Sequence, residues 1–159
     1  MIIKIICSLV IILSCSFIGI KLSNGLFLRV RTLSGMLAAI NKMESCISTV
    51  RMPLNEIYKE LSLEKGIVGE FFSKVKAGEN WKKQLDILPG ITSTDKKIFL
   101  DLSESLGDYE SERQLGQLNL TQNLLISSLK QAKTDMAENS KVYRAMSFFT
   151  GIVIAILLI

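Results

Sequence analysis

The apolar positions in the last third of the chain predict one long helix. Between Asp108 and Arg144 there is no proline, and Gly116 is the only glycine. The residues of one seam recur there at alternating steps of three and four, which is the period of a helix that packs along a partner helix. The seam consists of Leu115, Leu118, Gln122, Leu125, Leu129, Ala132, Met136, Asn139, Tyr143 and Met146. Its polar positions Gln122 and Asn139 would set the register against that helix, unless Gln122 faces solvent at the edge of the seam.

Apolar residues earlier in the chain also recur at helical spacing, with prolines, glycines and capping residues between the segments. Leu26–Val50 carries two overlapping apolar stripes, which predict a long helix covered by several partners. Met52-Pro53 ends it, because a proline disfavours the helical conformation of the residue before it. Shorter helices are expected within residues 53–63, 64–78, 80–88 and 92–107, the last with Thr92 and Asp95 as a capping box. No segment alternates as a strand does. The sequence therefore predicts an all-α fold, a single helical bundle of about six helices.

Charge divides the chain into three parts. Ile5–Ile20 and Ala145–Ile159 contain no charged residue, and every charged side chain except Lys4 lies between Lys21 and Arg144. We expect transmembrane helices at residues 1–20 and 145–159, continuous with the first and last helices of the bundle. The helical domain between them, residues 21–144, is long enough for one core. Ala145–Ile159 is short for a span, so it needs a partner or a thinned bilayer.

The N-terminal segment has three possible interpretations. It is a retained anchor, a signal peptide with Lys4 before an apolar run, or a lipoprotein signal in which Ile12–Cys15 loosely resembles a lipobox. The retained anchor is favoured, because the apolar run continues past Cys15 and enters a helical pattern without a flexible linker.

Basic residues border both apolar segments on the side of the middle domain. They are Lys21, Arg29, Arg31, Lys141 and Arg144. The positive-inside rule then places residues 21–144 in the cytoplasm and both ends of the chain across the membrane. Lys21, Arg29 and Arg31 either contact anionic headgroups or are solvated flanking charges. Small residues at Cys15 and Gly19, and at Gly151 and Ala155, would let the two spans approach closely.

Composition and motifs argue against an enzyme. Histidine is absent, which removes the commonest general base and metal ligand. The sequence has no phosphate-binding glycine loop, zinc-protease motif or serine elbow. Its three cysteines lack the spacing of a disulfide framework or zinc site. The net charge of +4 comes from interspersed acids and bases, unlike a nucleic-acid binder. We expect no cofactor, metal, nucleic acid or small-molecule substrate.

One acidic cluster surrounds the Leu106-Gly107 turn. It contains Glu104, Asp108, Glu110 and Glu112. Three interpretations are open: a catalytic or metal site, solvated acids that the helix dipole favours, or a docking surface for another protein. With Gln114 and Gln117, these residues form the candidate partner-docking surface. Trp81, Phe71 and Phe72 are expected in the core instead.

The whole pattern resembles the stage III sporulation protein AB family. The resemblance covers nearly the whole chain. It rests on Arg29-Val30-Arg31, Met52-Pro53-Leu54, Leu106-Gly107, Glu110-x-Glu112-x-Gln114, Gln117-Leu118, Leu120, Gly151 and Ile156–Ile159, together with the two terminal spans. This chain departs from the family at Glu110, where an aspartate is usual, and at Ser147, where a glycine is usual.

The resemblance implies a membrane platform that is not an enzyme. Such a protein would lie in the outer forespore membrane of the mother cell, with its soluble domain in the cytoplasm. It would assemble into the mother cell–forespore channel, a secretion-like complex required for sporulation. Its soluble domain would be similar to that of the type II secretion platform protein. Its partners would be the complex's cytoplasmic ATPase, similar to stage III sporulation protein AA, and the channel's other membrane proteins.

Two other functions remain open from the residues alone. The chain could be a membrane-anchored helical sensor or regulator of another envelope complex, with the seam of the last helix pairing in a dimer. An enzyme is the third possibility, although no group of residues suggests a reaction.

Overall fold

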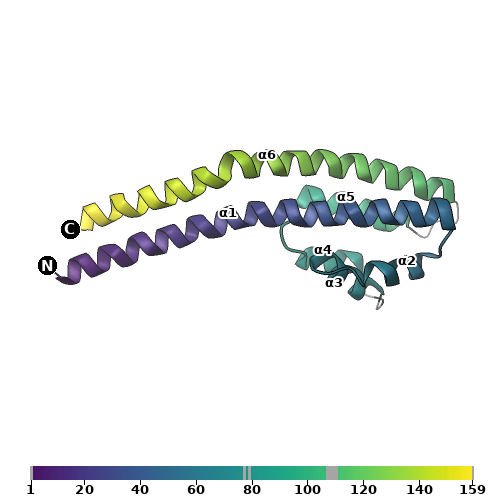
Figure 1. The fold of residues 1–159 in the computed structure, drawn as a ribbon, viewed down its shortest axis with the longest axis horizontal. Coiled ribbons are helices and arrows are strands. Elements are labelled where there is room, and N and C mark those ends of the chain that lie inside the picture. The colour runs from purple at the N-terminus through teal and green to yellow at the C-terminus, as the bar shows by residue number, and fades with distance from the viewer. Residues whose placement is uncertain (1, 77, 79, 107–110, 159) are drawn as a thin grey trace. The chain divides into compact units, whose positions relative to one another are not determined.

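All regular structure in the described part of the chain is helical. The structure is a computed structural model that describes residues 2–76, 78, 80–106 and 111–158. Along the chain lie α1 (Ile2–Ser45), a π-helical turn (Cys46–Val50), α2 (Leu54–Leu61), α3 (Ile67–Lys76), α4 (Trp81–Ile87), α5 (Ser93–Ser105) and α6 (Ser111–Leu158) (Figure 1). The described residues contain no strand. The predicted all-α fold, with long first and last helices, is confirmed.

Contacts group the chain into two compact units. The anchor unit comprises residues 1–28 and 132–159, and the helical unit comprises Arg29–Gln131. These limits lie eight and thirteen residues from the predicted domain limits at 20/21 and 144/145. The two divisions describe different properties, since the contacts mark where helices pack together and the predicted limits mark where charge begins. The predicted domain limits therefore stay a prediction.

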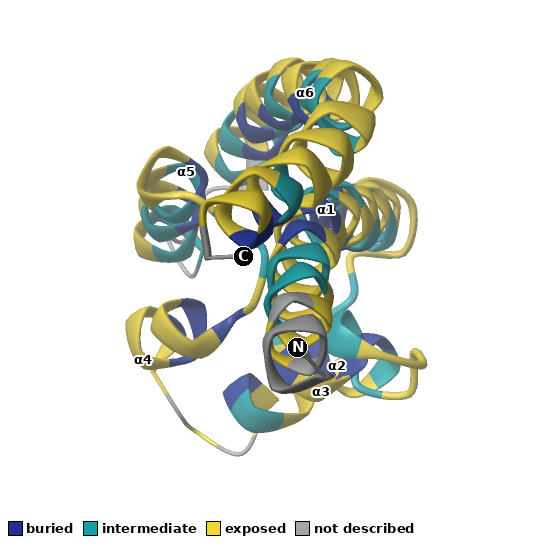
Figure 2. Ribbon diagram, turned by 90° about the vertical axis from the view of Figure 1, so that its left-hand side faces the viewer, coloured by how far each residue is buried: buried dark blue, intermediate teal, exposed yellow. Residues whose placement is uncertain are grey.

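Within the helical unit, α1 runs through the centre. Its part from Arg29 onward has the α6 segment on one side and α2, α3 and α4 on the other (Figures 1 and 2). This explains the wide apolar face that the sequence showed, because a central helix is buried on several sides. The buried apolar side chains of this part are Leu33, Met36, Ala39, Ile40 and Met43 of α1 and Ile47 of the π-helical turn. From α6 the buried core receives Leu118, Leu125 and Leu129.

The backbone at the end of α1 departs from the regular helix that the sequence predicted. The helix passes into the π-helical turn, and Arg51 then adopts the left-handed conformation with φ 51°. The backbone N–H groups of Arg51 and Met52 donate to the carbonyl of Cys46, so the turn is closed before Pro53. Pro53 is the N-cap of α2 rather than its first helical residue. The proline still ends one helix and begins the next, one residue from the predicted position.

Each of the four shorter helices lies within its predicted segment. Asn80 caps α4, because its side chain accepts from the backbone N–H of Lys82 at 2.8 Å. Gly78 follows α3 with φ +89°, a conformation that favours glycine. Thr92 and Asp95 form the predicted capping box at the start of α5. The predicted glycine cap at Gly107 and the predicted start of the last helix at Asp108 lie outside the described residues.

Aromatic side chains of α2, α3 and α4 form one cluster in the helical unit. Phe71, Phe72 and Trp81 are at most 9% exposed, and their rings meet edge to face with centroids 5.1–5.7 Å apart. Tyr58 stacks on Phe72. Burial raises the pKa of the Tyr58 hydroxyl to about 12, with a smaller opposing effect from its hydrogen bond to Trp81. The aromatic residues predicted in the core are therefore core residues.

Candidate membrane anchor and partner-docking surface

The two apolar segments are exposed along most of their length. α1 and α6 each contain an apolar stretch of 18 residues that is long enough to cross a membrane. Only 11% of the residues in each stretch are buried. Large side chains such as Leu13, Phe17, Phe149 and Leu157 are more than half exposed. Core helices of a soluble protein bury such residues, because each contributes roughly 1.5–3 kcal/mol when removed from water. The exposed apolar surface of the anchor unit indicates membrane association.

Small residues let the two helices of the anchor unit touch. A Cβ atom added at Gly19 would lie 2.7 Å from the Cβ of Ser147, and one added at Gly151 would lie 3.0 Å from the Cβ of Cys15. Residue numbers rise along α1 while those of the partner fall along α6, so the two helices are antiparallel. The small residues predicted at the helix contact therefore lie in it. The choice between a retained anchor and a cleaved signal stays a prediction.

One polar contact also joins these helices. Nε of Arg144 donates a hydrogen bond of 3.0 Å to the hydroxyl of Ser23, which is fully buried. Lys21 extends its ammonium over the ring of Phe17, 5.6 Å from the centroid. Lys141 is exposed. The sequence identified these basic residues as flanking the membrane, but no pattern in it indicated that Ser23 is the partner of Arg144.

Arg29 makes an ion pair inside the helical unit. Its Nε lies 3.3 Å from Oδ2 of Asp95, whose side chain is fully buried. The backbone N–H and hydroxyl of Thr92 donate to the same carboxylate oxygen, at 2.9 and 2.7 Å. Nearby on α1, the hydroxyl of Thr32 donates to the carbonyl of Pro89. Two α1 side chains thus hold the α4–α5 connection, whereas Arg31 is exposed.

These contacts set the charge state of Asp95. Burial alone would raise the pKa of its carboxyl, but the hydrogen bonds from Thr92 and the Arg29 guanidinium hold that pKa below its ordinary value. The second oxygen, Oδ1, is buried without a partner among the described residues. The contribution of this carboxylate to stability is therefore greatest when it is ionised.

The candidate partner-docking surface is described in part. Glu104, near the end of α5, and Glu112, in the first turn of α6, are exposed and make no ion pair with another described residue. Gln114 and Gln117 are half-buried. Asp108 and Glu110 lie outside the described residues. The contact of these six residues with a partner stays a prediction.

The predicted seam of α6 is buried or half-buried from Leu115 to Asn139 and exposed at Tyr143 and Met146. Gln122 is half-buried and its amide donates to the carboxylate of Glu44 on α1, as expected of a residue that sets the register. In the anchor unit, Tyr143 and Met146 are exposed, and Ser147 and Gly151 make the helix contact instead. The spacing therefore predicted the wrong face at Tyr143 and Met146, because near an apolar span every residue is a possible seam residue.

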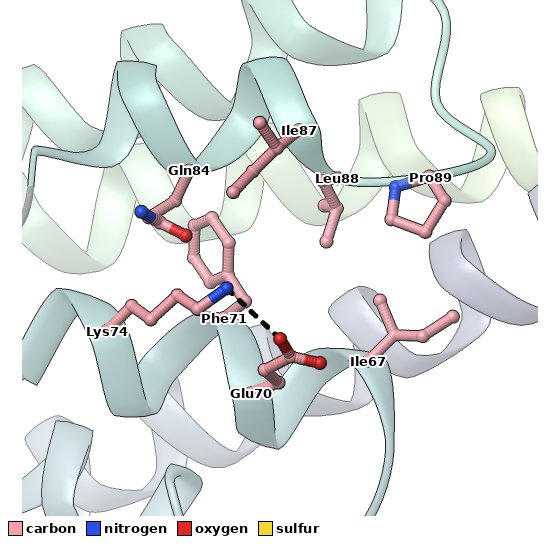
Figure 3. Close-up of a pocket in the computed structure, with 8 residues that line it drawn as sticks. All are labelled: Ile67, Glu70, Phe71, Lys74, Gln84, Ile87, Leu88 and Pro89. Atoms are coloured by element: carbon pink, nitrogen blue, oxygen red, sulfur yellow. Dashed lines mark hydrogen bonds and ion pairs between the residues drawn. The ribbon is translucent and has the colours of Figure 1, made fainter.

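A shallow pocket lies between α3 and α4 (Figure 3). It holds about 90 Å³, and its apolar lining includes Ile67, Phe71 and Ile87. Lys74 and Glu70 form an ion pair of 3.0 Å beside it. An exposed pair of this kind is a surface feature, and these side chains do not converge on a point where a small molecule would be held. Among the described residues, no group of histidine, cysteine, aspartate and glutamate side chains could hold a metal ion.

Comparison with known proteins supplies a family. The profile of stage III sporulation protein AB matches residues 4–159. The chain belongs to the stage III sporulation protein AB family. No curated protein and no solved structure gave a significant match.

Membership of the stage III sporulation protein AB family gives the chain a role in sporulation. Several residues on which the resemblance rested make structural contacts in this chain. Pro53 caps α2, Leu118 is fully buried in the helical unit, and Gly151 lies against Cys15 in the anchor unit. Ser147, which stands where a glycine is usual, meets Gly19.

Proposed function

We propose that this protein is a membrane platform of the mother cell–forespore channel and docks the cytoplasmic ATPase of that complex. It acts by holding partners at the membrane and catalyses no reaction itself. Its location is the outer forespore membrane of the mother cell, with the charged helices in the cytoplasm. The other membrane proteins of the channel are its further partners. Membership of the sporulation family supports this assignment.

The observation that carries the proposal is the division of α6 into an apolar and a charged part. One unbroken helix, Ser111–Leu158, begins with the exposed acid Glu112 and ends in the uncharged segment Ala145–Ile159. Its C-terminal part pairs with α1 through small residues in the anchor unit. A helix whose C-terminal end is apolar ties its charged residues to the membrane through the chain itself, which is what a platform requires.

The acids near the start of α6 suit a basic partner surface. The N-terminal end of a helix carries partial positive charge, which favours an acid such as Glu112 there. Glu112 and Glu104 also make no ion pair with another described residue, so they can pair with a cation supplied by a partner. Charged groups of this kind contribute mainly to the rate and specificity of association.

Charge reversal tests the docking surface. The ATPase is expected to co-purify with the full chain from detergent-solubilised membranes, and E110K/E112K is expected to abolish this and to block sporulation. The control is E56K. Glu56 is also an exposed acid in the first turn of a helix, α2, so its reversal has a similar effect on the helix dipole.

Two outcomes would contradict the proposal. The docking site is misassigned if E110K/E112K is folded and still recruits the ATPase. The platform function fails if the unchanged chain does not co-purify with the ATPase from sporulating cells at all. Circular dichroism of each purified variant establishes that its helices are intact.

A further inference from the structure

The contact between Ser23 and Arg144 leaves most of a guanidinium available at the end of the apolar segment. Ser23 is fully buried and accepts only from Nε of Arg144. A guanidinium has five N–H donors in a planar fork, so four remain on the two terminal nitrogens. These nitrogens have no hydrogen-bond or ion-pair partner among the described residues. The buried hydroxyl therefore fixes the group and leaves its outer edge free.

A second cation lies one helical turn away. Lys141 is exposed and three residues before Arg144, a spacing that places two side chains on one face of a helix. No acid pairs with Lys141 among the described residues. Tyr143, 38% exposed, adds an amphipathic ring of the kind that is enriched at membrane surfaces. Among the described residues beyond Arg144, every exposed side chain except Thr150 is apolar, including Met146, Phe148 and Phe149.

We propose that Arg144 and Lys141 bind the phosphodiester of an anionic phospholipid, with Ser23 as the positioning residue. The terminal nitrogens of Arg144 match two phosphate oxygens, and Lys141 adds a second positive charge. The acyl chains lie along the apolar surface that follows Arg144. This inference rests on the proposed cytoplasmic location of residues 21–144, which puts the site at the anionic leaflet.

The role of Ser23 separates this site from a general attraction between basic residues and a charged membrane. A diffuse attraction depends on the number of charges alone. A bound headgroup also depends on the orientation of the guanidinium, which the Ser23 hydroxyl holds. Removing that hydroxyl keeps every charge and is therefore the decisive change.

The experiment measures lipid binding by the full chain in a neutral maltoside detergent. Fluorescent phosphatidylglycerol and phosphatidylcholine are titrated separately, at one ionic strength. The chain is expected to bind phosphatidylglycerol more tightly, by about fivefold for each cation. R144Q is expected to lose about fivefold for phosphatidylglycerol and less for phosphatidylcholine, whose phosphodiester is neutralised by its own choline group. S23A is expected to lose at least about twofold for phosphatidylglycerol.

K133Q is the matched control, because Lys133 is an exposed lysine of the same helix and unit. The affinity of the K133Q variant for phosphatidylglycerol is expected to be unchanged.

Each of three results would overturn the site: equal affinity for the two lipids, an equal loss in K133Q and R144Q, or no loss in S23A. Displacement of the lipid by inorganic phosphate, at constant ionic strength, would show a site for free phosphate and overturn the assignment to a lipid.

Alkaline carbonate extraction separates failure of this inference from failure of the proposed function. Release of the unchanged chain from membranes would contradict the membrane platform itself. Retention of both the unchanged chain and R144Q, without a lipid preference, would contradict the headgroup site alone.

Discussion

Arg29 was expected beside the membrane surface, yet its side chain is paired with a buried carboxylate. Its partner Asp95 lies 66 residues away on α5. The sequence did reveal that Asp95 caps a helix, because the capping box is a local pattern. It could not reveal that the same carboxyl is buried beside a cation, since that depends on how α5 packs on α1. Whether Arg29 also meets the membrane surface stays a prediction.

Removal of the cation should destabilise the helical unit. In R29M the Asp95 carboxylate stays buried without its counter-charge, at an expected cost of about 3 kcal/mol in the free energy of unfolding. The measurement is chemical unfolding of the full chain in detergent, followed by the fluorescence of Trp81, the only tryptophan. The control K74M breaks an exposed helical pair and should cost at most about 0.5 kcal/mol. Equal effects of R29M and K74M would show that the buried pair contributes no more than a surface pair.

The same carboxylate predicts a pH dependence. The pKa of Asp95 is lower in the folded chain than its ordinary value, so its contribution to stability is present above about pH 4 and is lost as the pH falls below that. The unfolding free energies of the unchanged chain and D95N should therefore differ most at neutral pH and converge below about pH 4. A difference that stays constant across this range would mean that the charge of Asp95 is unimportant.

At the scale of the helices, local signals predicted most of the fold. Pro53, Asn80, Gly78 and Thr92 lie at or beside the helix ends that their chemistry indicated. The helix contact in the anchor unit was harder, because an apolar span has no polar face to distinguish its two sides. There the regular seam pointed to Tyr143 and Met146, which are exposed. The small residues were the better guide, since only they let two backbones approach closely.

Disulfide formation should report the pairing of the two anchor helices. In a chain with C7S and C46S, we expect G151C to form a disulfide with native Cys15. A Cβ at position 151 lies 3.0 Å from the Cβ of Cys15, so a small separation of the helices reaches the roughly 3.8 Å of a typical disulfide. Oxidation in membranes, followed by maleimide labelling of the remaining thiols, measures the yield.

The control for this cross-link is V153C. Val153 is 57% exposed and two residues further along α6, on another side of the helix. A cysteine there should stay reduced within the chain. If V153C reacted with Cys15 as readily as G151C, the antiparallel contact described above would be incorrect.

At the scale of the whole molecule, one chain supplies both an apolar anchor and a charged helical unit. The family places it in sporulation, and the two long apolar helices indicate membrane association. The order of the helices and the two apolar ends could be predicted from the sequence, because charge and periodicity record them directly. The partner could not, because exposed acids such as Glu104 and Glu112 fit a docking surface and a solvated helix end equally well. A measurement of which protein lies beside these acids decides between a docking surface and a solvated helix end.

That measurement is photo-cross-linking in sporulating cells. A photoreactive phenylalanine analogue at position 112 should cross-link the full chain to the cytoplasmic ATPase, while the same analogue at the exposed control position 56 should not. This result would place the partner on the first turn of α6. If position 112 gave no cross-link to the ATPase in cells where the protein supports sporulation, or if position 56 cross-linked equally, the proposed docking surface would be contradicted.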